Sequence, residues 1–345
     1  MKPTFHFSLV NGPFDDPCVF VRLIHEGRGL LFDAGDLGGL GTGNILKISD
    51  IFVTHTHMDH FIGLDEALRH CLKREMPLRL YGPKDLAERV EGKLGGYSWN
   101  LIREYPLKIE VFGIGRQSLS HTGFYAEDSF SKTVYPDRPF DGVLWEEPLF
   151  KVKGLLLSHE IPVVAYTLEE EYHININKAR LEEKGLTAGP WLSSLKAAVR
   201  ENYDFIKAEG VLSLKKMGVS PYSICFDGSP CLKDLMDIVA ITKGQKVSYV
   251  MDVAPTDENL EKLIPFVRGS DILFCEAYFL ERDRDRAVER SHLTAALAGR
   301  IAGEAEVGQL QILHFSPRYR DCEQELYDEA MREFEAARGA IIPCS

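Results

Sequence analysis

Residues 54–60 read Thr-His-Thr-His-Met-Asp-His and begin at the end of the apolar run DIFVTH at 50–55, which we expect to be a strand. Three imidazoles and one carboxylate therefore lie within six residues at a strand end. Neutral imidazole nitrogen and carboxylate oxygen are good ligands for Zn²⁺ and related divalent ions. The alternative is a chance group of surface histidines. Because the chain has only 11 histidines and three are here, we favour a metal site.

The composition is that of a globular protein. Of 345 residues, 45% are hydrophobic and 27% charged, which excludes a disordered or fibrous chain. The net charge of -12 opposes general attraction to nucleic acid, so a polyanionic partner would need a local basic patch or bound cations. No run approaches the ~20 apolar residues that span a bilayer, and no signal-like apolar core follows the amino terminus. We therefore expect neither membrane insertion nor secretion.

The cysteines indicate a reducing compartment. They number seven, are spread along the chain and form no Cys-x-x-Cys pair. This pattern fits reduced thiols better than a disulfide scaffold or a cysteine-type zinc site. We expect a cytoplasmic protein.

Strand-like and helix-like segments alternate along the chain, which is typical of an α/β fold. Strands are expected at 18–24, 29–35, 50–55, 246–253, 271–279 and 309–315, and helical spacing occurs at 64–74, 84–94 and 293–303. The stretch 98–147 is rich in Gly, Pro, Ser and aromatic residues, and we interpret it as an irregular insertion. Our default is one domain covering residues 1–345.

The 54–60 stretch matches the His-x-His-x-Asp-His signature of the metallo-β-lactamase superfamily. This resemblance implies a four-layer αββα sandwich with insertions and a site for two divalent metal ions at one edge of its two sheets. Asp33 in LFDAG resembles the superfamily's upstream Asp-x-Gly, whose aspartate orients a ligand histidine.

The same resemblance implies a ligand set for both metals. His55, His57 and His159 would bind the first, whereas Asp59, His60 and His314 would bind the second, with Asp252 bridging them. Zinc is the metal we expect, although manganese or iron would accept the same ligands. A hydroxide between two such ions is a nucleophile near neutral pH, so the implied reaction is hydrolysis.

The carboxy-terminal half resembles ribonuclease Z, the endonuclease family that removes 3′ trailers from precursor tRNA. Residues 272–278 (ILFCEAY) are similar to its His-Glu-Ala-Thr motif, and 291–294 (SHLT) to its His-Ser-Thr motif. The segment LQILHFSPRYRD at 310–321 also resembles that family. This chain departs from the two motifs by having Cys275, Tyr278 and Leu293.

Phosphodiester hydrolysis supplies roles for three of these side chains. The departing ribose oxygen must be protonated, and a histidine near the metals is suited to this. We therefore expect His292 to be the general acid, Glu276 to orient it and hold its charged form, and Asp59 to act as the base that positions the attacking water.

The family also carries a substrate-binding arm between its third-motif histidine and its bridging aspartate. Residues 177–199 resemble that arm, and we place the candidate arm at 172–235. From 178 to 216, eight basic and five acidic residues give a local charge of +3, which favours phosphate binding. The residues that we expect to contact tRNA are Lys178, Lys184, Gly189, Pro190 and Lys196. The resemblance further implies a homodimer.

Three functions from different classes remain. The first is the metal-dependent endonuclease of precursor tRNA. The second is a related hydrolase of a small phosphodiester or of another ester or lactone, which stays open because the family's amino-terminal motif is replaced by SLVNGPFDDPCVFVRL at 8–23. The third is a non-catalytic binding protein, against which the complete ligand set argues.

Overall fold

The computed structural model describes residues 4–24, 26–201 and 235–341. The chain divides into two compact units, which we describe one at a time. The larger unit comprises residues 3–145, 152–169 and 246–345, and the smaller one comprises 1–2, 146–151 and 170–245.

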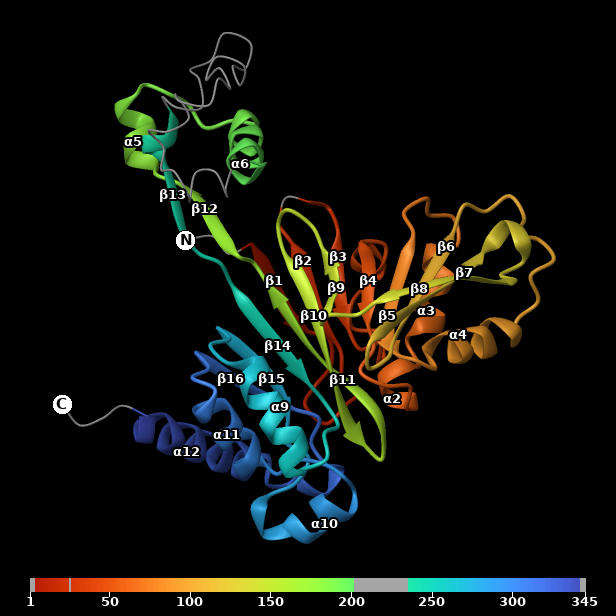
Figure 1. Ribbon diagram of the computed structural model, residues 1–345, viewed down its shortest axis with the longest axis vertical. Coiled ribbons are helices and arrows are strands. Elements are labelled where there is room, and N and C mark those ends of the chain that lie inside the picture. The colour runs from red at the N-terminus through yellow and green to blue at the C-terminus, as the bar shows by residue number, and fades with distance from the viewer. Residues whose placement is uncertain (1–3, 25, 202–234, 342–345) are drawn as a thin grey trace. The chain divides into compact units, whose positions relative to one another are not determined.

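Two β-sheets form the centre of the larger unit (Figure 1). The first contains, in order, β1 (Phe5–Leu9), β2 (Val19–Leu23), β3 (Gly29–Phe32), β4 (Ile48–Phe52), β5 (Leu78–Pro83), β6 (Lys108–Ile114), β7 (Ser118–Tyr125) and β8 (Lys132–Pro139). The second contains, in order, β16 (Gln309–Leu313), β15 (Ile272–Glu276), β14 (Lys246–Val250), β11 (Ile161–Glu169), β10 (Lys151–His159) and β9 (Val143–Glu146). Strands β3, β4, β5 and β6 run parallel, as do β14, β15 and β16.

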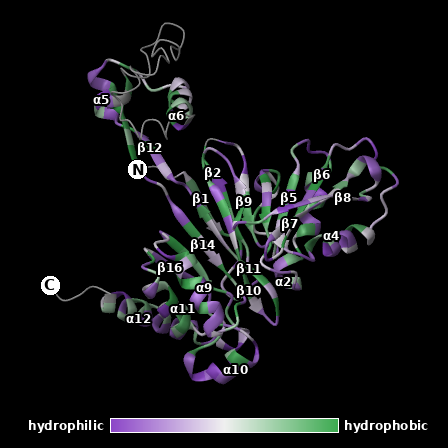
Figure 2. Ribbon diagram, viewed as in Figure 1, coloured by the Kyte–Doolittle hydropathy of each residue, from purple (hydrophilic) through white to green (hydrophobic). Residues whose placement is uncertain are grey.

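The two sheets pack face to face through aromatic side chains. Phe32 of β3 contacts both Tyr166 of β11 and Tyr249 of β14, with ring centroids 6.0 and 5.6 Å apart. The Tyr166 hydroxyl donates a hydrogen bond to the Val53 carbonyl at 2.6 Å, so this buried polar group is satisfied across the interface. Figure 2 shows hydrophobic residues along the strands of both sheets.

Helices cover the outer faces of the sheets. α3 (Leu64–Cys71) and α4 (Leu86–Gly95) share one apolar cluster with β4, β5 and β6. α9 (Asp257–Val267), α11 (Ala295–Glu304) and α12 (Glu323–Ile341) share a second cluster with β14, β15 and β16. Shorter helices are α1 (Thr42–Ile45), α2 (Met58–Phe61) and α10 (Arg284–Glu289). The order helix, sheet, sheet, helix confirms the four-layer αββα sandwich.

The stretch 98–147, for which we expected an irregular insertion, instead contains β6, β7, β8 and β9. Strand β7 has two serines, a threonine and a glycine among its eight residues, so its apolar signal is weak. Strand β8 is an edge strand with two prolines and no fully buried side chain. The expectation of irregular structure was therefore wrong, because neither strand carries a strong apolar pattern.

The smaller unit has its own core. Strands β12 (Tyr172–Ile176) and β13 (Val239–Lys243) pair antiparallel, and α5 (Lys178–Glu183) and α6 (Trp191–Glu201) supply apolar residues beside them. The candidate arm at 172–235 belongs to this unit, although its residues 202–234 lie outside the described part of the chain. Among the described residues, every helix is too short or too polar to cross a membrane.

A close backbone contact follows the 54–60 stretch and yields a stability prediction. A Cβ atom added to Gly63 would lie 2.0 Å from the Gly35 carbonyl oxygen, so we expect Gly63→Ala to destabilise the fold by about 1–3 kcal/mol. Gly92→Ala is the matched control, since nothing lies within 4 Å of its added Cβ in helix α4. There we expect stabilisation of about 0.5–1 kcal/mol. Urea unfolding of both variants measures the difference, and equal stabilities would contradict the packing argument.

Candidate metal centre

The candidate site lies where strands of the two sheets end. The 54–60 stretch follows β4, and Asp252 and His314 follow β14 and β16. His159 is the last residue of β10, and Glu276 is the last residue of β15. Because β14, β15 and β16 are parallel, their carboxyl ends meet at one edge, which is the usual position of a binding site in such sheets.

Unusual backbone conformations direct these side chains. Asp33, Asp252 and His314 have φ values of 54°, 52° and 59°, in the left-handed region that non-glycine residues rarely adopt. Glu160 and Ser291, which adjoin His159 and His292, have φ values of 56° and 59°. Such strain persists only where packing over-determines it, and it gathers at functional sites. The turns at Asp33, Asp252 and His314 redirect these side chains as the chain leaves β3, β14 and β16.

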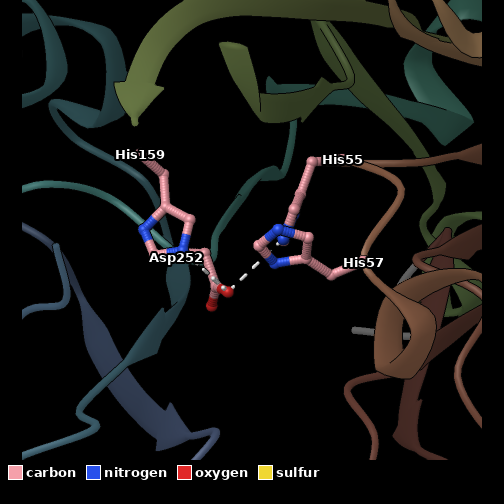
Figure 3. Close-up of side chains that lie close together, drawn as sticks. All are labelled: His55, His57, His159 and Asp252. Carbon is pink, nitrogen blue, oxygen red and sulfur yellow. Dashed lines mark ion pairs between the residues drawn. The ribbon is translucent and has the colours of Figure 1, made fainter. Parts of the chain in front are cut away.

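Asp252 lies at the centre of the site. Its Oδ2 atom is 3.5 Å from His55 Nε2, 3.6 Å from His159 Nε2 and 3.5 Å from His60 Nε2. Figure 3 shows the side chains of His55, His57 and His159 turned toward this carboxylate from different parts of the chain. Ligands at zinc bond lengths of about 2.0–2.1 Å in a tetrahedron are about 3.4 Å apart, so these separations suit a shared ion.

The structure brings the seven predicted metal ligands together in overlapping groups, in each of which the candidate ligand atoms lie within 4.8 Å of one another. One group is His55, His57, His159 and Asp252, another is Asp59, His60 and His314, and a third is Asp252, Glu276, His292 and His314. The first two correspond to the two sets expected from the sequence.

The buried carboxylate of Asp33 holds the 54–60 stretch in place through hydrogen bonds. Its carboxylate accepts hydrogen bonds from the Thr54 amide at 2.7 Å and from the Tyr249 hydroxyl at 3.0 Å, and it lies 2.8 Å from His60 Nδ1. His159 Nδ1 is similarly 2.7 Å from the Ser291 carbonyl. Since an acceptor holds Nδ1 of each ring, the Nε2 lone pairs of His60 and His159 remain available to a metal.

Several buried polar atoms of the site make no hydrogen bond. They are His55 Nε2, His60 Nε2, Asp252 Oδ1 and His314 Nδ1. The last two atoms are 2.8 Å apart but are not aligned as donor and acceptor. A buried polar atom without a partner costs about 1–3 kcal/mol, and several that face one another are the arrangement a metal ion would satisfy. The donor set therefore fits divalent cations.

The electrostatics of the site are those of a buried anion that attracts positive charge. Burial and the neighbouring His60 lower the pKa of His55 to about 2. Burial also opposes the charged form of His314, but Asp252 outweighs it and raises the pKa of His314 to about 10. For Asp252, burial is outweighed by His314 and His60, so the pKa of its carboxyl lies well below the usual range. A divalent cation supplies the same compensation as these protons.

His292 and Glu276 form a hydrogen-bonded pair next to Asp252. His292 Nδ1 lies 2.7 Å from Glu276 Oε2, and the Val253 amide donates to Glu276 Oε1 at 2.5 Å. Burial disfavours the charged form of His292, yet the charge and hydrogen bond of Glu276 raise its pKa above the usual value. Because Glu276 holds Nδ1, the Nε2 atom of His292 is the one able to reach a substrate.

Tyr278 is a site residue whose role sequence reasoning missed, although it was visible as a departure from the family motif. Its ring stacks on His292, with centroids 4.1 Å apart and an interplanar angle of 10°. It also meets the His314 ring edge-on at 5.1 Å. The signal in the sequence was its place in the 272–278 segment, two residues after Glu276, where the family motif has threonine.

The predicted tRNA-contacting residues are not among these groups; they belong to the smaller unit. Lys178 and Pro190 are exposed, and Gly189 is partly exposed. Lys184 is exposed and forms an ion pair with Asp237 at 2.9 Å. Burial, followed by the nearby Arg200, lowers the pKa of Lys196.

Comparisons with known proteins agree with this geometry. Residues 11–172 match the model of the metallo-beta-lactamase superfamily. Ribonuclease Z of Deinococcus radiodurans is 27% identical over 96% of this chain and 97% of its own length, and ribonuclease Z of Nanoarchaeum equitans is 29% identical over 90% and 80%.

Among solved structures, the metallo-beta-lactamase fold protein YhfI from Bacillus subtilis superposes with a TM-score of 0.55 at 17% identity, covering 96% of this chain and 94% of its own. The fold and the resemblance expected from the sequence are thus both confirmed. The chain has the metallo-beta-lactamase fold and is similar to ribonuclease Z proteins over nearly its whole length.

Proposed function

We propose that this protein is a metal-dependent phosphodiesterase of the ribonuclease Z type, which cleaves the 3′ trailer from precursor tRNA. The observation that carries the proposal is the Glu276–His292 pair, hydrogen-bonded at 2.7 Å and set beside a cluster of candidate metal ligands. A cluster of ligands alone suits many hydrolases. A buried histidine positioned by a carboxylate adds a proton donor, which an alkoxide leaving group requires.

The metal ligands of this proposal are His55, His57, Asp59, His60, His159, Asp252 and His314. Two divalent cations held there, which we propose to be zinc, would supply an acidified water and offset the negative charge of the phosphate.

The remaining steps belong to the side chains of the protein. The Asp59 side chain is 42% exposed and lies 3.3 Å from His314 Nε2, so it is held in place yet can reach the attacking water and accept its proton. His292 Nε2 donates a proton to the ribose 3′ oxygen as the bond from phosphorus to that oxygen breaks. Glu276 keeps the imidazole oriented and stabilises its charged form. The products are a 3′-hydroxyl on the tRNA and a 5′-phosphate on the trailer.

The direct test of the function compares two substrates. We expect the protein to cleave a precursor tRNA with a 3′ trailer, to lose this activity with a chelator and to regain it when zinc is added back. A generic diester, bis(p-nitrophenyl) phosphate, is assayed beside it. Hydrolysis of the diester without cleavage of any precursor tRNA would reject the tRNA assignment.

Hydrolysis of the diester without cleavage of precursor tRNA would favour a related hydrolase of a small phosphodiester, or of another ester or lactone. One observation supports this alternative. Asp16 lies near Asp59, and burial together with the Asp59 charge raises the pKa of its carboxyl, so a further acid stands beside this candidate ligand and disfavours a polyanion such as RNA.

We further propose that the smaller unit binds tRNA through Lys178, Lys184, Gly189, Pro190 and Lys196, and that the protein works as a cytoplasmic homodimer. The described cysteines, Cys18, Cys71, Cys275 and Cys322, are free thiols, which supports a reducing compartment.

Charge reversal tests the binding role of the smaller unit. We expect Lys178→Glu to raise the KM for precursor tRNA about tenfold. The slope of the logarithm of the binding constant against the logarithm of the salt concentration should become shallower by about one, because binding with one phosphate contact fewer releases fewer counterions. Lys262→Glu on α9, also exposed, is the control for the same charge change. Equal effects of the two variants would mean that the smaller unit has no specific role.

A further inference from the structure

Two cavities adjoin each other at His292. One, of about 550 Å³, is lined by candidate ligands that include His57, Asp59 and Asp252. The other, of about 630 Å³, is lined by Phe279, Arg286, Ser316 and Arg318. Both cavities share Tyr278, Glu289, Arg290 and His292. Each is within the ordinary size range of small-molecule sites, and the second contains none of the seven predicted metal ligands.

The position of His292 decides what the second cavity receives. A proton donor must lie within hydrogen-bond reach of the departing oxygen. Since the reacting phosphate lies at the ligand cluster and the leaving group departs opposite the attacking water, the leaving group extends away from the cluster and past His292. The cavity on that side is the second one. Tyr278, stacked on the imidazole at 4.1 Å, lines both cavities.

The charges of the second cavity suit a phosphate. Arg286 and Arg290 are four residues apart around helix α10, a spacing that places both on one face, and both side chains are exposed. Arg318 adds a third guanidinium, although it is already paired with Asp283 at 3.2 Å. Glu289 is the one acid in the lining. In a chain with a net charge of -12, this excess of arginine is notable because guanidinium groups bind phosphate with two parallel hydrogen bonds.

We propose that the second cavity is the leaving-group subsite: Tyr278 packs against the nucleoside whose 3′ oxygen departs, and Arg286 and Arg290 bind the phosphate at the 5′ position of that nucleoside. This inference rests on the proposed phosphodiesterase function, but it does not require the substrate to be tRNA. It assigns the cavity to a nucleoside 5′-phosphate with a free 3′-hydroxyl. This is the terminal nucleotide of the product that leaves with the 3′-hydroxyl.

Two isomeric nucleotides test the proposal by binding. Titration calorimetry of the full-length, metal-loaded protein with adenosine 5′-monophosphate should show at least tenfold weaker binding in the double variant Arg286→Ala/Arg290→Ala than in the wild type. In the same double variant, the affinity for adenosine 3′-monophosphate should fall less than threefold, because the phosphate of this isomer occupies the ligand cluster. Arg284→Ala, on the same helix but outside this cavity, is the control and should bind both isomers like the wild type.

The contribution of Tyr278 is tested in the same way. Tyr278→Phe keeps an aromatic ring and should retain most of the affinity for the 5′ isomer, whereas Tyr278→Leu should weaken it several-fold. If the arginine double variant loses affinity equally for the 5′ and 3′ isomers, or loses affinity for neither, the proposal is overturned. If the 5′ isomer shows the predicted loss while precursor tRNA is not cleaved, the subsite stands and the tRNA assignment fails.

Discussion

Replacement of Asp252 by alanine is expected to reduce phosphodiester cleavage by at least ~10³-fold and the metal content to one ion or fewer per chain. This carboxylate lies 3.5–3.6 Å from three imidazole nitrogens, and it is the only candidate ligand shared by the groups around His55 and His292. Loss of a metal that acidifies water and offsets phosphate charge removes several kcal/mol of transition-state stabilisation. Elemental analysis and a diester assay on the same sample measure both effects.

Asp257→Asn is the control for the Asp252 variant, since it removes a nearby acid in the first turn of α9 that lies outside the ligand groups. It should keep its metal and its activity. Thermal unfolding of each variant separates loss of the site from loss of the fold. A folded Asp252→Ala protein with two ions per chain and normal turnover would contradict the central position of this carboxylate.

Replacement of His292 by alanine should lower cleavage of precursor tRNA by about 10²–10⁴-fold, the usual contribution of a general acid, while leaving the metal content unchanged. The loss should depend on the leaving group. A ribose oxygen needs a proton as it departs, whereas p-nitrophenolate is stable without one, so hydrolysis of bis(p-nitrophenyl) phosphate should fall far less. The measurement is the ratio of kcat/KM for the two substrates.

His70→Ala on helix α3 is the matched control, because His70 is outside the site and pairs only weakly with Glu66, at 3.9 Å. It should leave both activities near their wild-type values. Equal losses on the two substrates in His292→Ala would show that this residue binds or supports the site and does not donate the proton.

Much of the fold could be predicted from the sequence because its signals are local. The buried parallel strand β4 reads as a short apolar run and ends directly at the 54–60 stretch. The edge strand β8 was missed because it has no inward-facing apolar set to reveal it. A short apolar run therefore reveals a fully buried strand such as β4, whereas an exposed edge strand such as β8 depends on the neighbours with which it pairs.

The candidate site was partly predictable for a different reason. His55, His57, Asp59 and His60 lie together in the sequence, so their chemistry is apparent without a structure. His159, Asp252 and His314 were selected by resemblance, and only the folded sheets show that they lie within reach of the first group.

Other features of the site could not be predicted. The left-handed conformation of Ser291 and the stack of Tyr278 on His292 depend on how β15 and the segment before α11 pack together. Neither the spacing of apolar residues nor a short motif in the sequence indicates such contacts between distant segments. The cavity beyond His292 was invisible for the same reason.

The number of metal ions bound per chain tests the central claim most directly. Inductively coupled plasma mass spectrometry of the full-length protein, purified without chelator, should find about two zinc, manganese or iron ions per chain, removed by a chelator and recovered after dialysis against zinc. Folded protein that contains almost no metal, and that binds none when zinc is supplied, would contradict the account.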